Sequence, residues 1–383
     1  MNAKVFRNWL FVLHRYLGLM VGLIAIVIGL TGSLLVFHTE ISELQQHHQI
    51  GTITPQGRPL PIETIINAVK PIYANRSDAV LQVLDAPTKP NAPFRVVYAT
   101  KANDWIENYV HPYTGAVLGN TLKPNATEHF FSTAYKLHYS LLAGDIGIKI
   151  AGIVGLLMCI LTLTGAMLWP GWRKLIAGFT IKWNAHPKRV NFDLHKVVGM
   201  IAVAFLFFTF FTGFCWNFYE FSEPFIRVVT LSPSKTEPVS QVVAKQAPLR
   251  LADQLQTAQA ALPDAALRRI YFPAKPEDAL RFRFKLPQES VSYGESNVYL
   301  DQYSGVVLRV DHGLKLPLGD RVLNAFVPLH YGTFGGLPTR IFYVFVGLTP
   351  LILFTTGFVM WWYRKRKKQP DFEETPQVIT KHF

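Results

Sequence analysis

Four histidines share one local pattern, because each directly follows a leucine at or near the start of a long apolar run. They are His14, His138, His195 and His330. An imidazole can bind a metal ion or transfer a proton, and it also suits a membrane–water interface. Interfacial placement explains a single such histidine. Four of them in a bundle with few other ionisable groups indicate a shared chemical role, because polar groups inside membranes are costly.

The spacing to later motifs sorts these histidines into two pairs. The glycine of a Thr-Gly pair follows His14 and His195 at one and the same interval. It follows His138 and His330 at a second, longer interval, and a tryptophan follows each of these two histidines at a further matched interval. Matched offsets with matched residue types predict that the chain is an internal duplication. The residues at these offsets, in chain order, are Gly32, Gly165, Trp169, Gly213, Gly357 and Trp361.

The elements that must position these histidines are four uncharged apolar stretches. They cover 16–37, 150–172, 197–219 and 341–363. Each has the ~20 residues that a helix needs to cross a ~30 Å hydrocarbon layer. The sequence therefore predicts four transmembrane helices. We expect the first to be a membrane anchor and not a cleaved signal peptide, because its apolar run is long and no small-x-small site follows it.

The net charge of +13 is an orientation signal. Basic residues crowd the N-terminus, the 173–196 region and the "RKRKK" run at 364–368, which is the positive-inside pattern. Both termini and the short loop before the third span are expected in the cytoplasm. Nucleic acid is not an expected partner, whereas membrane lipid is. The two cysteines, Cys159 and Cys215, fall inside spans and are expected to serve packing.

The two long segments between spans repeat one pattern. Each has a short helix, predicted at 61–74 and 250–262, followed by strand-like runs that end in "HPYTGAVLG" or "DQYSGVVLR". A glycine turn between β-branched runs is typical of a hairpin. Each segment is therefore predicted to be a small α+β domain, with loops at 87–93 and 232–248.

The chain resembles the PepSY-associated transmembrane family in two features. They are the ends "HPYTGAVLG" and "DQYSGVVLR" of the two outer segments, and the run "LHRYLGLMVGLIAIVIGLTGSLLVF" before the first of them. The resemblance covers essentially the whole chain. Within that family the chain is most similar to inner-membrane ferric-siderophore reductases of the FoxB type. The resemblance implies PepSY domains on the periplasmic side and a ferric siderophore as substrate.

The depth of each histidine in the membrane determines which of the others it can face. His14 and His195 are expected near the cytoplasmic face, and His138 and His330 near the outer face. Two imidazoles that face each other across a four-helix bundle are the axial-ligand arrangement of a b-type haem. A catalytic zinc site would need three ligands close together. The sequence therefore predicts two haems b at two depths, with each histidine a ligand of haem iron. It predicts no catalytic residue, because the four histidines are cofactor ligands.

Further residues bear on the outer site. A continuous helix from His138 would outrun the bilayer, so a break is expected in the glycine-bearing segments 141–147 and 332–338. Tyr139 and Tyr331 are expected as hydrogen-bonding residues around the outer ligands. His38 is an alternative ligand. Four glycines lie in the spans near these histidines, and they either supply a flat surface for a macrocycle or serve ordinary helix packing. They are Gly18, Gly22, Gly29 and Gly199.

The predicted fold is a four-transmembrane-helix bundle from a 2+2 duplication, with two small α+β PepSY-like periplasmic domains. The segments in chain order are transmembrane helix 1 (1–37), PepSY-like domain 1 (38–137), an outer-face histidine segment with helix 2 (138–172), a cytoplasmic loop (173–193), helix 3 (194–219), PepSY-like domain 2 (220–328), a histidine segment with helix 4 (329–363) and a cytoplasmic tail (364–383).

The expected function is a haem-containing reductase of the bacterial inner membrane that takes electrons from a cytoplasmic or quinol donor to a periplasmic ferric siderophore. Two alternatives stay open. One is a PepSY-based binding or regulatory protein without enzymatic activity, and the other is a quinol-dependent b-type cytochrome with another acceptor.

Overall fold

The computed structural model describes residues 2–100, 105–122, 124–242, 246–289, 291 and 293–366, and the side chains of 45–49 and 366 lie outside the described set. The described residues form two compact units. The helical unit contains residues up to Phe37, from Phe131 to Glu223, and from Asn324 onward. The sheet unit contains His38–Phe130 and Pro224–Leu323. The predicted tail beyond Arg366 lies outside the described residues.

The helical unit is built on long apolar helices. In the described residues, four helices are long and apolar enough to span a membrane. They are α1 (Ala3–Leu35), α5 (Gly144–Leu168), α7 (Pro187–Asn217) and α11 (Leu337–Arg366). The predicted spans are confirmed. Helices α1 and α7 begin well before the uncharged stretches, because the basic segments that precede these stretches are themselves helical.

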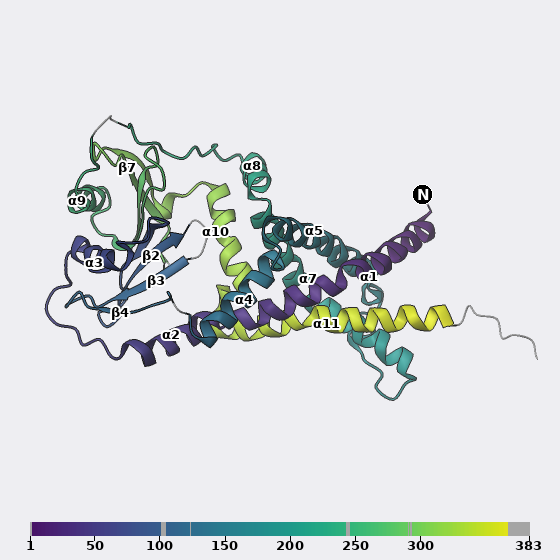
Figure 1. The fold of residues 1–383 in the computed structure, drawn as a ribbon. Helices are drawn as coiled ribbons and strands as arrows, with labels where there is room; N and C mark the ends of the chain where they lie inside the picture. The colour runs from purple at the N-terminus through teal and green to yellow at the C-terminus, as the bar shows by residue number, and fades with distance from the viewer. Residues whose placement is uncertain are drawn as a thin grey trace, which may run out of the picture. The chain divides into compact units, whose positions relative to one another are not determined.

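These helices form a bundle (Figure 1). Helix α1 packs against α5 and α11, and α7 packs against the same two helices, so α1 and α7 face each other across the bundle. The contact between α1 and α11 is close at Gly29, where an added Cβ would collide with the backbone carbonyl oxygen of Gly347. Gly29 therefore serves helix packing. Cys159 and Cys215 are free and buried, as expected.

Two shorter helices carry the outer histidines. Helix α4 (Ala126–Ser140) is followed by Leu141 and Leu142, whose φ angles of 51° and 59° interrupt the helix before α5 begins. Helix α10 (Leu318–Tyr331) ends at Gly332, which is left-handed with φ 69°. The breaks predicted at the glycine-bearing segments are thus confirmed. His138 and His330 lie in the last turn of a short helix rather than on a span.

The sheet unit corrects the expectation of two separate small domains. Its described strands form one eight-stranded antiparallel sheet in the order β4-β3-β2-β1-β5-β6-β7-β8. The strands are β1 (Ala79–Asp85), β2 (Phe94–Thr100), β3 (Trp105–Val110), β4 (Val117–Asn120), β5 (Ala266–Tyr271), β6 (Leu280–Lys285), β7 (Ser296–Leu300) and β8 (Val307–Asp311). The halves join where Leu84 of β1 pairs with Ile270 of β5. This pairing removes an exposed edge from each half.

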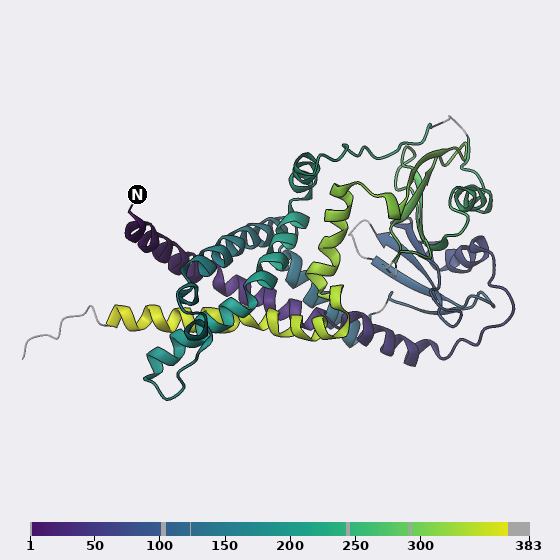
Figure 2. The ribbon, with the colours of Figure 1, turned by 180° about the vertical axis from the view of Figure 1, so that it is seen from behind.

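One hydrophobic core serves the whole sheet. Helices α3 (Ile62–Val69) and α9 (Leu251–Ala261) pack against a single buried cluster that includes Leu84, Ile270 and Phe282. Figure 2 shows both helices on the same side of the sheet. The glycine turns predicted before β4 and β8 are confirmed, because Gly115 and Gly305 have φ angles of 73° and 72°.

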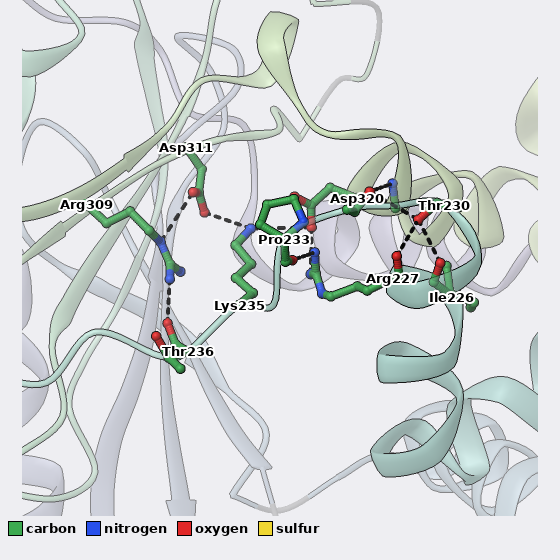
Figure 3. Close-up of polar contacts among 11 residues, drawn as sticks. Ile226, Arg227, Thr230, Pro233, Lys235, Thr236, Arg309, Asp311 and Asp320 are labelled. Carbon is green, nitrogen blue, oxygen red and sulfur yellow. Dashed lines mark hydrogen bonds and ion pairs between the residues drawn. The ribbon is translucent and has the colours of Figure 1, made fainter.

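An ion-pair network holds the start of α10 within the sheet unit (Figure 3). Arg227 of α8 (Tyr219–Val229) donates to Asp320 of α10 at 2.8 Å, and both side chains are largely buried. The Nζ atom of Lys235 lies 3.4 Å from a carboxylate oxygen of Asp320 and 3.0 Å from one of Asp311 in β8, so Lys235 links the two aspartates. Removal of one partner from such a network leaves an uncompensated buried charge.

Two further α-helices of the described residues are α2 (His38–Ile50) and α6 (Leu175–Phe179).

Candidate functional site

The inner histidines face each other across the bundle. His14 comes from α1 and His195 from α7, and their ring centroids are 6.3 Å apart with an interplanar angle of 89°. Both side chains are partly accessible because they border a cavity between the helices. The structure thus brings together the two residues whose sequence offsets match.

The outer histidines form a second pair of the same kind. His138 of α4 and His330 of α10 have ring centroids 6.0 Å apart and an interplanar angle of 76°. The indole of Trp216 packs on His330 with centroids 4.8 Å apart. Burial lowers the pKa of His138, and burial together with the nearby His138 lowers the pKa of His330 to about 3. Both rings are therefore neutral, the state in which imidazole binds a metal.

A threonine hydroxyl holds the Nδ1 atom of every histidine in these pairs. The four contacts are His14 with Thr164 at 2.9 Å, His138 with Thr31 at 3.2 Å, His195 with Thr356 at 2.8 Å and His330 with Thr212 at 2.8 Å. Each threonine belongs to one of the Thr-Gly pairs of the sequence, and each lies on a helix other than that of its histidine.

The threonines also determine which ring nitrogen carries the proton. Each hydroxyl donates its single hydrogen to the carbonyl four residues earlier in its own helix, at 2.7 to 2.8 Å. The hydroxyl oxygen can then only accept, so Nδ1–H of each histidine is the donor. For His138 the carbonyl oxygen of Ile28 accepts from the same nitrogen at 2.9 Å. In a neutral ring this arrangement leaves the lone pair on Nε2, where it can bind a metal ion.

The glycine of each Thr-Gly pair lets a ring lie against the helix. A Cβ added to Gly165 would be 3.1 Å from Cε1 of His14, and one added to Gly32 would be 3.0 Å from Cε1 of His138. The corresponding distances are longer at Gly213 and Gly357, where the added Cβ would be 3.6 Å from the ring of His330 or His195. A methyl group at either of the first two glycines would thus push the ring away by a few tenths of an ångström, whereas the other two leave room for it.

This difference supplies a matched comparison at the inner site. We expect Gly165→Ala to displace His14 by a few tenths of an ångström and to weaken ligand binding there by roughly 10-fold, which is in the range for changes around metal ligands. Gly357→Ala should leave binding within about a factor of two by the same rule. For the haem that the sequence predicts, the measurement is its retention by the two variants. Equal effects would contradict the geometry.

The cavity between the inner histidines is mostly apolar. Gly18 and Gly199, each one helical turn after a histidine of the pair, line it, and a Cβ on either would only touch a leucine side chain at 3.5 to 3.6 Å. Gly22 is different, because its added Cβ would collide with the ring of Phe354. Gly18 and Gly199 thus leave open surface beside the ligands, whereas Gly22 also serves packing.

The residues present fit a haem with two axial histidines. Two imidazoles on opposite sides of one metal ion, with each nitrogen about 2 Å from it, have ring centroids about 6 Å apart. Both pairs show this separation. Among the described residues, no group of three or more His, Cys, Asp or Glu side chains lies together. The donor set at each level is therefore two imidazoles, which is a common ligand set of a b-type haem.

The remaining predicted site residues lie as follows. The ring of Tyr139 packs on Tyr135 with centroids 4.9 Å apart, and the ring of Tyr331 lies 5.7 Å from that of His330 and 6.1 Å from that of Trp216. The hydroxyls on the ligand nitrogens are those of threonines, so a hydrogen-bonding role of these tyrosines stays a prediction. His38 is the first residue of α2 and belongs to the sheet unit. Its role as an alternative ligand also stays a prediction.

The threonines are the functional residues that the sequence interpretation did not assign. Their signal was present, because each precedes the glycine whose offset from a histidine is repeated. That offset relates residues on one chain segment, however. The observed partner of each threonine is a histidine of a different segment, far away in the sequence.

The comparison with known proteins gives one family. No curated protein matches the chain. The model of the family described as the PepSY-associated TM region matches residues 11–364, which include all four histidines and their threonines. The membrane-spanning helices agree with this match. The protein is a membrane protein that belongs to the PepSY-associated transmembrane family.

Proposed function

We propose that this protein is a haem-containing oxidoreductase of the bacterial inner membrane that reduces a ferric siderophore on the periplasmic side and so releases its iron. The observation that carries the proposal is the pair of facing imidazoles at each of two levels, with the Nδ1 atom of every ring in contact with a threonine hydroxyl. A binding protein without a cofactor has no need to orient four rings in this way.

The proposed ligands are His14 and His195 for an inner haem b, and His138 and His330 for an outer one. Haem supplies one-electron transfer between ferric and ferrous iron. The chain sets the distance between the levels. His14 and Thr31, which supports His138, lie on the same helix α1, and their separation along it is about 25 Å at about 1.5 Å per residue. Most of a ~30 Å hydrocarbon layer would thus lie between the two sites.

In this proposal the chain arose by duplication of a unit with two membrane spans. The duplication is supported by the two histidine pairs, because each pair uses one histidine and one Thr-Gly pair from each half of the chain. The sheet unit would comprise two PepSY-like halves on the periplasmic side. The siderophore rests on the family resemblance. The electron donor is a quinol or a cytoplasmic reductant, because basic residues near the inner pair favour a cytoplasmic position for that end.

The orientation can be tested with reporter fusions. A reporter placed after Phe383 should be active only if it functions in the cytoplasm, and one inserted in the 232–248 linker only if it functions in the periplasm. The physical reason is the positive-inside distribution of Lys and Arg. The reverse pattern of activity would refute the assignment of inner and outer sites.

The function itself is tested by an optical spectrum of the purified full-length protein with haem quantification, before and after a ferric siderophore is added to the reduced form. We expect about two low-spin haems per chain, which the ferric siderophore reoxidises. A haem-free protein from haem-replete cells would point instead to a binding or regulatory role. Haem that is reduced by quinol but not reoxidised by any ferric siderophore would indicate a cytochrome with another acceptor.

A further inference from the structure

The two halves of the chain contribute equivalent histidines to the inner site, but the basic residues that follow these histidines have different partners. Lys196, which follows His195, is buried and fully engaged: its Nζ lies 2.7 Å from Asp193 and donates to the carbonyl of Ala177 at 2.8 Å. Arg15, which follows His14, has no such partners. Its Nε is buried and makes no hydrogen bond in the described structure. Its guanidinium lies over the ring of Tyr16, at 4.7 Å from the centroid.

A second arginine lines the same cavity. Arg364 of α11 lies over the ring of Phe11 at 4.6 Å, and the guanidinium of Arg15 is 6.0 Å from that ring. Both arginines thus converge on one side of the cavity, from two helices that pack together. The described residues that line the cavity include no aspartate or glutamate. Among the described residues, no acidic side chain at the cavity balances these two guanidinium groups, of which Arg15 is half-buried and Arg364 exposed. An anion at this side of the cavity could therefore be bound by both.

The opposite side of the cavity lacks this charge. The residue that corresponds to Arg364 in the other half of the chain, at the offset that relates His330 to His138, is Trp172, which is neutral. The residue that corresponds to Arg15 is Lys196, whose charge Asp193 already balances. Two histidines related by an approximate two-fold axis would accept a flat ring in either of two orientations. The two arginines, which no described acidic residue of the cavity lining balances, distinguish these orientations.

We propose that Arg15 and Arg364 bind the two propionate carboxylates of the inner haem and so fix its orientation, with the anionic edge toward α1 and α11. This inference rests on the proposed function. A guanidinium binds a carboxylate through two parallel N–H···O bonds, which suits a planar dianionic edge better than an ammonium group does. Positive charge beside the ring also favours ferrous over ferric iron, so the arginines should raise the potential of the inner haem.

The experiment compares the double variant Arg15→Gln/Arg364→Gln with the parent and with Lys365→Gln. Lys365 is the matched control, because it neighbours Arg364, packs on Trp361 and does not line the cavity. All three are made in full-length protein that carries His330→Ala, so that haem is held at the inner site. The probes are haem b and haem b dimethyl ester, loaded into haem-depleted protein in phosphatidylcholine nanodiscs. The readouts are the rate of haem release and the midpoint potential.

We expect haem b to leave the double variant at least ~10-fold faster than the parent, the equivalent of one charge-assisted contact. Its potential should fall, whereas Lys365→Gln should match the parent. The dimethyl ester lacks both carboxylates, so it should leave parent and double variant at equal rates. An equal release of haem b from parent and double variant would overturn the inference.

Two other outcomes also count against the inference. A difference between parent and double variant that persists with the ester would show a structural effect. A difference that appears only when the nanodiscs contain phosphatidylglycerol would assign the arginines to a lipid phosphate. A parent protein that binds no haem at all would refute the proposed function itself, whereas unchanged haem binding in the double variant would refute only the role of the arginines.

Discussion

Replacement of His14 by alanine is expected to remove low-spin haem from the inner site and to leave the outer site intact. The ring of His14 is one of two imidazoles at that level, and no third His, Cys, Asp or Glu joins them among the described residues. His195→Ala should have the same effect, because the two residues hold equivalent positions. The measurements are haem content, expected to fall from about two to about one low-spin haem per chain, and a redox titration.

A milder variant separates ligation from folding. Thr164→Val removes the acceptor of the His14 Nδ1–H bond but keeps the shape of the side chain. We expect it to keep haem at the inner site with an affinity reduced by about 10- to 100-fold, as for other residues that orient metal ligands. If His14→Ala and His195→Ala both keep full low-spin haem content and unchanged titrations, the inner histidines are structural and the proposed function loses its main support.

Much of the bundle follows from the sequence because membrane spans obey local rules. A run of uncharged residues long enough to cross a bilayer must be helical, since its backbone polar groups have no other partners there. The observed α5 and α11 therefore cover most of the predicted spans. The break after α4 could also be predicted, because a helix continuous from His138 would be too long for the bilayer. Its precise form at Leu141 and Leu142 could not, because leucine has no local preference for positive φ.

The tertiary pairings could not be read from local patterns. Leu84 and Ile270 pair across the centre of the sheet although they come from opposite halves of the chain, so the two outer segments form one unit. Period-2 alternation predicts that a strand has a buried face, but it does not say which strand covers its edge. The threonines illustrate the same limit. The offset of Thr164 from His138 was visible, whereas its contact with His14 depends on how α1 and α5 pack.

The outer pair allows the most demanding test, because it would be the point where electrons leave the protein. We expect His330→Ala to lower the rate of ferric-siderophore reduction by roughly 100-fold or more, since loss of a ligand should exceed the 10- to 100-fold effect of a residue that only orients one. The inner haem should still be reduced by its donor, because His14 and His195 keep their threonine contacts. Stopped-flow spectra in the presence of donor and ferric siderophore measure both steps.

The matched control for the outer pair is His129→Ala. His129 lies on α4 with His138, but its side chain is exposed. We expect this variant to reduce the siderophore at the wild-type rate, which would show that loss of a histidine from these short helices does not by itself stop the reaction. If His330→Ala also retained the wild-type rate, electrons would leave the protein by another route. His38 would then be the first residue to replace, because it is the remaining histidine that follows a span directly.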